Sequence, residues 1–181
     1  DHPEWQNEQP FKAALGNNLN ELLKQGEHGL LKLVMTTHAS NTTDEFEAIV
    51  KEWLSKAKHP TQNRPYTELV YQPMLELINY LQANDFKTFI VSGGGIEFMR
   101  PWVEEVYGIP RDQVIGSSIK TEYDYNDGNP VMKRLPEVDF IDDKEGKPEG
   151  INKFIFNSIF TDSINFIYSY TYCCVVRVFL I

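Results

Sequence analysis

The stretch TFIVSGGG, residues 88–95, constrains the fold of this chain more than any other part of the sequence. Its continuous apolar run predicts a strand that is buried on both faces, which is typical of parallel sheets. Apolar residues with helical spacing lie on both sides of it, at residues 73–84 and 96–107. Pro101 is expected to kink or restart the second of these helices, because proline lacks the amide that a helix interior uses. A helix, a strand and a helix in succession predict an α/β layer.

Composition and periodicity divide the chain into three regions. Residues 1–64 carry helical apolar spacing, which predicts a helical domain, and the polar connector TQNRPY at residues 61–66 marks its boundary. Residues 65–155 hold the α/β pattern, and the alternation from Ile115 to Tyr125 followed by an NDGN turn predicts an appended β-hairpin. Residues 156–181 form an atypical apolar tail with very few charges.

The charge balance argues against one class of partner. Lys and Arg number 17 against 26 Asp and Glu, so the formal net charge is −9. A nucleic acid backbone would be repelled at long range, and we expect no nucleic-acid partner. Any anion that this chain binds must therefore be bound locally.

The ends and the cysteines say little about location. The chain does not begin with methionine, and no basic stretch followed by an apolar run opens it, so we expect a native N-terminus that has been trimmed. Cys173 and Cys174 are adjacent, which leaves the redox compartment undetermined. A soluble protein is expected, either cytoplasmic or exported, and its oligomeric state stays open.

Ser92 and the glycines after it stand where ligands bind in open α/β sheets, at the carboxyl end of a strand. Ser92 offers a hydroxyl, and Gly93 and Gly94 can bring backbone N–H groups close to a ligand without a Cβ in the way. This predicts a cradle for a phosphoryl group, although a tight strand-to-helix turn explains the same glycines equally well. Two rival motifs fit poorly. A dinucleotide fingerprint needs glycine at Phe98, and a hydrolase elbow needs glycine at Ile90.

A second stretch, IDDKEGKPEGINKFI at residues 141–155, places Lys147 directly before Pro148 at a predicted helix start. Lysine opposes the helix dipole there, at a cost of ~0.3–1 kcal/mol if exposed, so a bound anion would offset it. Taken alone, Lys147 is more simply a solvated lysine in a charged loop. The neighbouring acids Asp142 and Asp143 are interpreted as part of a solvated loop.

Together, FIVSGGG and GKPEGI resemble two of the four motifs of the haloacid dehalogenase (HAD) superfamily of hydrolases, in its phosphoserine-phosphatase-like branch. The longer run from RPYTELVYQPMLELINYL through MRPWVEEVYGI and GSSIK is similar to a bacterial subgroup of these phosphatases. The resemblance implies part of a HAD-type three-layer Rossmann-like α/β core, with residues 1–64 as a helical cap.

The same resemblance implies an activity and its residues. The activity is hydrolysis of a small phosphomonoester through an aspartyl-phosphate, with Mg²⁺ as the cofactor. Ser92, Gly93 and Gly94 would bind the phosphoryl oxygens, and Lys147 would neutralise their charge. Ser92 and Lys147 are thus the implied catalytic residues.

Two motifs of the family do not occur in the sequence. No D-x-D follows an apolar strand, and the DYND of residues 124–127 lies in the predicted hairpin turn. The acidic loop that holds Mg²⁺ is expected near residues 160–170, where Asp162 is the only acid and is the candidate metal ligand. A surface or capping aspartate is the simpler interpretation of Asp162, because Mg²⁺ usually needs more than one carboxylate. We expect this chain alone to be inactive. The alternative is a degenerate, non-catalytic module that binds a phosphorylated ligand.

The tail allows three interpretations. We favour an altered reading frame or a truncated gene product, because its composition is unlike the rest of the chain. A membrane segment over residues 164–181 is marginal, since Arg177 and several polar residues interrupt it. One or two buried strands are the third possibility.

The remaining candidates receive structural interpretations. The histidines show no metal-ligand spacing, and Trp5, Trp53 and Trp102 are interpreted as core residues. For the tryptophans in the helical region, the alternative is that they line a substrate pocket.

Overall fold

The computed structural model describes residues 3–26, 29, 32–33, 36, 39, 41–126, 128–155, 165–168 and 177–180, with the backbone alone at residue 126 and in the last two segments. Contacts divide the chain into two compact units. The first contains residues 1–42 and 119–138, and the second contains residues 43–118 and 139–181. This division does not show whether residues 1–64 form a cap domain, so the domain boundary at residue 64 stays a prediction.

The sheet is built around the strand that contains Ser92. Its five strands are β1 (Thr88–Gly95), β2 (Val114–Asn126), β3 (Asn129–Phe140), β4 (Asn165–Tyr168) and β5 (Arg177–Leu180). Their order across the sheet is β3-β2-β1-β5-β4. β1 runs parallel to β2 and antiparallel to β5, and β4 runs antiparallel to β5. The predicted parallel pairing is therefore present, and β2 and β3 form the predicted hairpin.

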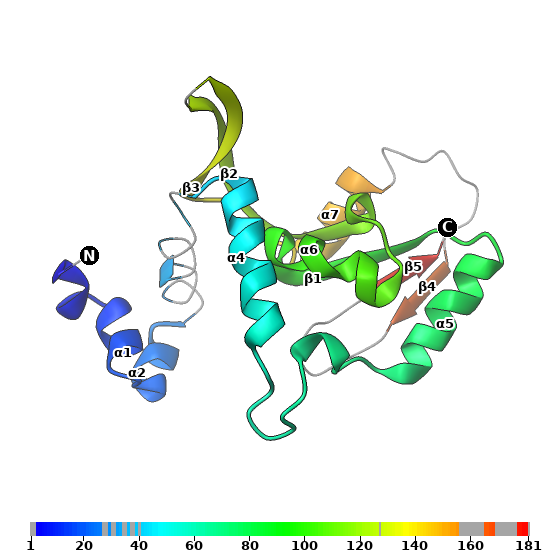
Figure 1. Ribbon diagram of the computed structural model, residues 1–181, viewed down its shortest axis with the longest axis horizontal. Helices are drawn as coiled ribbons and strands as arrows, with labels where there is room; N and C mark the ends of the chain where they lie inside the picture. The colour runs from blue at the N-terminus through cyan, green and yellow to red at the C-terminus, as the bar shows by residue number, and fades with distance from the viewer. Residues whose placement is uncertain are drawn as a thin grey trace. The chain divides into compact units, whose positions relative to one another are not determined.

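Helices cover both faces of β1 (Figure 1). Alternate side chains of a strand point to opposite faces of its sheet. Ile90 packs in one core cluster with residues of α5 (Gln72–Ala83) and α6 (Ile96–Tyr107). Phe89 and Val91 pack in a second cluster with α7 (Gly146–Phe154). The three layers confirm the predicted α/β core.

Helix α4 (Thr43–Lys56) belongs to the same unit as β1 and packs on α6. Its apolar stripe is only partly buried. Phe46 and Val50 are buried, whereas Ile49 is 50% exposed and Trp53 is 46% exposed. Interpreting Trp53 as a core residue was therefore wrong, because α6 covers a narrower strip than the apolar spacing of α4 provides.

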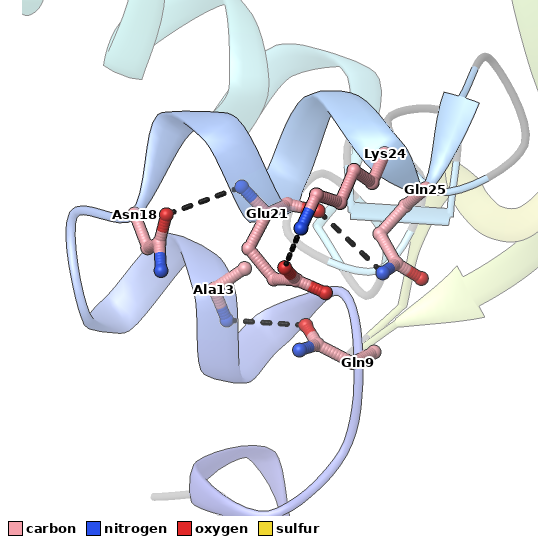
Figure 2. A network of polar contacts seen from close by, with 6 residues as sticks. All are labelled: Gln9, Ala13, Asn18, Glu21, Lys24 and Gln25. Carbon is pink, nitrogen blue, oxygen red and sulfur yellow. Dashed lines mark hydrogen bonds and ion pairs between the residues drawn. The ribbon is translucent and has the colours of Figure 1, made fainter.

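The first unit contains the short helices that the spacing predicts (Figure 2). They are η1 (Pro3–Gln6), α1 (Phe11–Leu15) and α2 (Leu19–Lys24). Asn18 caps α2, since its side chain accepts a hydrogen bond from the Glu21 amide at 3.1 Å. Glu21 also pairs with Lys24 at 3.0 Å. Trp5 stacks on Phe11 with ring centroids 4.7 Å apart, which joins η1 to α1.

Two expectations about individual elements have clear outcomes. Helix α6 runs without interruption from Ile96 to Tyr107, so Pro101 does not restart it. The described parts of the tail form strands β4 and β5, as the third interpretation of the tail predicted. Only the backbone of these strands is described, so the predicted burial of their side chains stays a prediction. Among the helices that the structure describes, none combines the length and apolarity needed to cross a membrane.

Candidate functional site

Ser92 lies at the carboxyl end of the parallel pair β1 and β2, opposite Gly116. The strand register shifts between Ser92 and Gly95, so Gly93 and Gly94 form a bulge at the tip of β1. Ser92 is 2% exposed, whereas the three glycines after it are exposed. A buried hydroxyl thus lies directly beneath an open stretch of glycine backbone, which we call the glycine tip (residues 93–95).

The backbone conformation of the glycine tip does not require glycine. None of its three residues has a positive φ, and Gly95 is extended at φ −65° and ψ 123°. A Cβ added at Gly93 would meet its nearest atoms at 3.4 Å or more, which is ordinary contact. A strained turn therefore does not explain these glycines. The hypothesis that they keep the backbone open to a ligand gains weight.

Gly116 is different, because packing requires it. A Cβ at this position would lie 2.7 Å from the Gly94 carbonyl oxygen and 2.6 Å from Met99 Cε. The close approach of β2 beneath the tip therefore depends on a bare backbone at Gly116.

One hydrogen bond within the tip differs from the simplest picture of a cradle. The Gly94 amide donates to Ser92 Oγ at 3.1 Å, so this N–H turns back toward the serine. A hydroxyl accepts and donates at the same time, and accepting this bond does not use the proton of Ser92. Ser92, Gly93 and Gly94 were expected to bind the phosphoryl oxygens, but the Gly94 amide already donates its hydrogen bond to Ser92.

Lys147 lies in the first turn of α7, as predicted, but it is not a solvated lysine. Only 4% of it is exposed, and its Nζ donates to the Asp142 carbonyl oxygen at 3.0 Å. A buried ammonium is costly unless polar groups surround it. Asp142 is fully buried as well, and a Cβ added at Gly150 of α7 would lie 2.9 Å from its Oδ1. Interpreting Asp142 as part of a solvated loop was wrong, whereas Asp143 is exposed.

Ser117 joins the two halves of the site, although it was not among the site residues predicted from the sequence. Its Oγ donates to the Gly93 carbonyl oxygen at 2.9 Å and accepts from the Asp142 amide at 3.0 Å. The Asp142 carbonyl oxygen accepts from Lys147 and lies 3.6 Å from the position that a Cβ on Gly93 would take. The glycine tip and Lys147, far apart in the sequence, are therefore brought to one place.

The described residues do not fit a magnesium site. Among them, no group of three or more His, Cys, Asp or Glu side chains gathers in a way that could hold a metal ion. Near the tip, Asp143 Oδ1 lies 3.5 Å from the Cβ position of Gly93, but Mg²⁺ favours several oxygen ligands in octahedral geometry. Asp162, the predicted ligand, lies outside the described residues. We therefore derive no step of chemistry through Mg²⁺.

A cavity of about 350 Å³ lies at the opposite end of β1 from Ser92. Thr88, the first residue of β1, lines it together with Gln82 and Lys87. Gln82 Nε2 donates to Thr88 Oγ1 and to the Gly108 carbonyl oxygen, both at 3.0 Å, and so fills part of the wall. This cavity is not part of the candidate site.

The fold and the site define an α/β protein with polar groups gathered at the carboxyl end of parallel strands, the usual ligand-binding edge of such sheets. The family model for haloacid dehalogenase-like hydrolases matches residues 5–147, which include both Ser92 and Lys147. The chain belongs to this family of HAD-like hydrolases. A comparison with curated proteins found no match.

Proposed function

We propose that the site binds the phosphoryl group of a small phosphate monoester, in the manner of a phosphatase-type hydrolase of the phosphoserine-phosphatase-like branch. Ser92 would donate its hydroxyl hydrogen bond, Gly93 its backbone N–H, and Lys147 its ammonium charge. One observation carries this proposal: the glycine tip and Lys147 are linked through the same peptide. Ser117 forms hydrogen bonds with the Gly93 carbonyl and the Asp142 amide, and Lys147 donates to the Asp142 carbonyl.

The residues present support binding more directly than hydrolysis. The family resemblance implies an aspartate nucleophile in a D-x-D motif, and the 181 residues contain no D-x-D. We propose that this chain alone binds phosphate esters without hydrolysing them. A phosphatase and a non-catalytic binding module would share the same phosphate site, and they differ only in turnover.

Binding is tested by titrating the chain with inorganic phosphate in a calorimeter. We expect Lys147→Met to weaken phosphate binding by about tenfold or more, since hydrogen bonds to charged groups contribute about 1.5–3 kcal/mol. Lys153→Met is the matched control, because Lys153 is on the same helix and exposed. Ser92→Ala should also weaken binding. Equal affinity in the wild type, Ser92→Ala and Lys147→Met would contradict the proposed site.

Turnover is tested with a generic aryl phosphate in the presence of Mg²⁺. We expect no hydrolysis by this chain, and hydrolysis by a longer chain that carries an apolar strand followed by D-x-D upstream. Activity in this chain that survives the combined replacement of Ser92 and Lys147 by alanine would show that the chemistry takes place elsewhere.

A further inference from the structure

Three aromatic rings from three different elements meet, and one of them, Phe98, belongs to the helical turn directly after the glycine tip. We call them the aromatic shelf (Trp53, Tyr66 and Phe98). The rings of Trp53 and Tyr66 are stacked, with centroids 5.3 Å apart and 23° between their planes. Trp53 and Phe98 are 5.9 Å apart and tilted by 58°. Nearly half of Trp53 is exposed, at 46%, although it takes part in both contacts. The shelf thus offers aromatic surface to solvent.

The shelf adjoins the candidate phosphate site. Phe98 lies in the first turn of α6, which begins directly after Gly95. Phe98 Cβ is 4.0 Å from the position that a Cβ on Gly95 would take, so the Phe98 side chain begins beside the open backbone of Gly95. Trp53 comes from α4 and Tyr66 from η2 (Tyr66–Glu68), and all of these elements belong to one compact unit.

The charges on either side of the shelf are balanced. Beside Trp53 on α4, Glu52 pairs with Lys56 at 2.6 Å. Around Tyr66, Arg64 pairs with Glu68 at 3.4 Å. Both of these acids therefore have a basic partner. These two acids therefore offer no free carboxylate to a cation, and the stacking of Trp53 on Tyr66 covers one face of each ring, so the rings do not surround a cation as an aromatic cage does. The shelf therefore favours an uncharged ring over a quaternary ammonium group.

We propose that the aromatic shelf binds the leaving group of the phosphate monoester, and that this group is a flat, uncharged aromatic ring. The proposal rests on the proposed function, because the shelf gains this role only if the neighbouring tip holds the phosphoryl group. A ring on the exposed part of Trp53 removes apolar surface from water and stacks as aromatic pairs do in proteins. The shelf thereby selects among phosphate esters that the tip alone would treat alike.

The test compares four ligands in calorimetric titrations of the full chain: inorganic phosphate, methyl phosphate, phenyl phosphate and phosphocholine. We expect phenyl phosphate to bind about tenfold more tightly than methyl phosphate, the upper range of a single aromatic contact. Phosphocholine should show no such gain. In Trp53→Ala the advantage of phenyl phosphate should disappear while affinity for inorganic phosphate is unchanged, and Trp53→Phe should restore part of the advantage.

Tyr80→Ala is the matched control, because Tyr80 is an aromatic residue of the same unit, 65% exposed, on α5. It should leave all four affinities unchanged. Since Trp53 is itself 46% exposed, circular dichroism should show both variants folded.

The outcomes separate this inference from the proposed function. If inorganic phosphate does not bind the wild type, the proposed function fails and the inference fails with it. If inorganic phosphate binds but phenyl phosphate and methyl phosphate bind equally, the inference alone is overturned. Tighter binding of phosphocholine would overturn the choice of an uncharged ring. If Trp53→Ala changes the sedimentation coefficient but no ligand affinity, the shelf is a self-association surface and the inference is again overturned.

Discussion

The geometry of the site depends on the hydroxyl of Ser117, because it forms hydrogen bonds with both the glycine tip and the loop that contacts Lys147. Ser117→Ala removes two hydrogen bonds and leaves the Gly93 carbonyl and the Asp142 amide to relax separately. A typical hydrogen bond contributes about 0.5–1.5 kcal/mol. We expect phosphate affinity to fall about fivefold, measured by calorimetric titration with inorganic phosphate.

Two control variants separate a positioning role for Ser117 from a general loss of stability. Ser117→Thr keeps the hydroxyl and should restore most of the affinity. Ser118→Ala removes the neighbouring hydroxyl, which donates to Asp139 at 3.0 Å, and should leave phosphate binding unchanged. Lower stability in urea without any change in phosphate affinity would show that Ser117 has a structural role only.

Individual residues differ in how far the sequence could place them. Ser92 and Lys147 were predictable, because a strand end and a helix start can be recognised from local patterns. Ser117 could have been suspected, since it follows the apolar start of β2 and the carboxyl ends of parallel strands meet at one edge. The burial of Asp142 was not predictable. It depends on how the segment after β3 packs on α7, which no local pattern encodes.

Among the elements, helix α6 was predicted with its observed ends, whereas Trp53 on α4 was wrongly predicted to be buried. Glycine on both sides delimits α6, with Gly95 before it and Gly108 after it at φ 64°. Periodicity shows which residues of α4 share a face, but how much of that face is covered depends on the partner helix. The half-exposed Trp53 is the consequence, and it is also what makes the aromatic shelf available.

A charge cluster attaches α4 to the loop before β2. Glu47 pairs with Lys51 at 2.6 Å on the same helix and with Arg111 of η3 (Arg111–Gln113) at 2.7 Å. The Lys51 hydrogen bond is the main cause that lowers the pKa of Glu47 below its ordinary value of 4.5, and Arg111 lowers it further. Burial of the carboxyl, the second-largest influence after Lys51, acts in the opposite direction.

We therefore predict that Glu47→Gln lowers stability at neutral pH, by about 0.5–1 kcal/mol after screening by solvent. The folded pKa is depressed, so the stabilisation is fully present above the ordinary pKa of 4.5 and is lost as the pH falls through the lowered folded value. Urea midpoints of the wild type and the variant should differ at neutral pH and converge in acid. High salt should shrink the difference at neutral pH. A difference of equal size in acid would show that charge is not its cause.

For the molecule as a whole, the central feature is that β1 is covered on both faces and paired along both edges. Its faces pack against α5 and α6 on one side and α7 on the other. Its edges pair with β2 and with β5, which comes from the apolar tail. The α/β layers were predictable from the pattern of residues 65–155. That residues 177–180 complete the sheet was not, because pairing between distant segments leaves no trace in local periodicity.

The last prediction concerns this contribution of the tail to the whole fold. β5 lies between β1 and β4, so every backbone N–H within it faces one of these two neighbours. Val178, which pairs with Ile90, is therefore in a position where proline must remove a bond of the ladder. We expect Val178→Pro to lower the free energy of unfolding by about 1–3 kcal/mol, measured by urea denaturation.

The same variant should also change the association state, because a loosened β5 leaves one edge of β1 open to another chain. Sedimentation velocity should then show concentration-dependent oligomers that the wild type does not form under the same conditions. Val178→Ile is the matched control, since it keeps the amide, the β-branch and the apolar character, and it should behave like the wild type. If Val178→Pro unfolds at the same urea concentration as the wild type and sediments identically, β5 does not protect β1, and the sheet is stable without the tail.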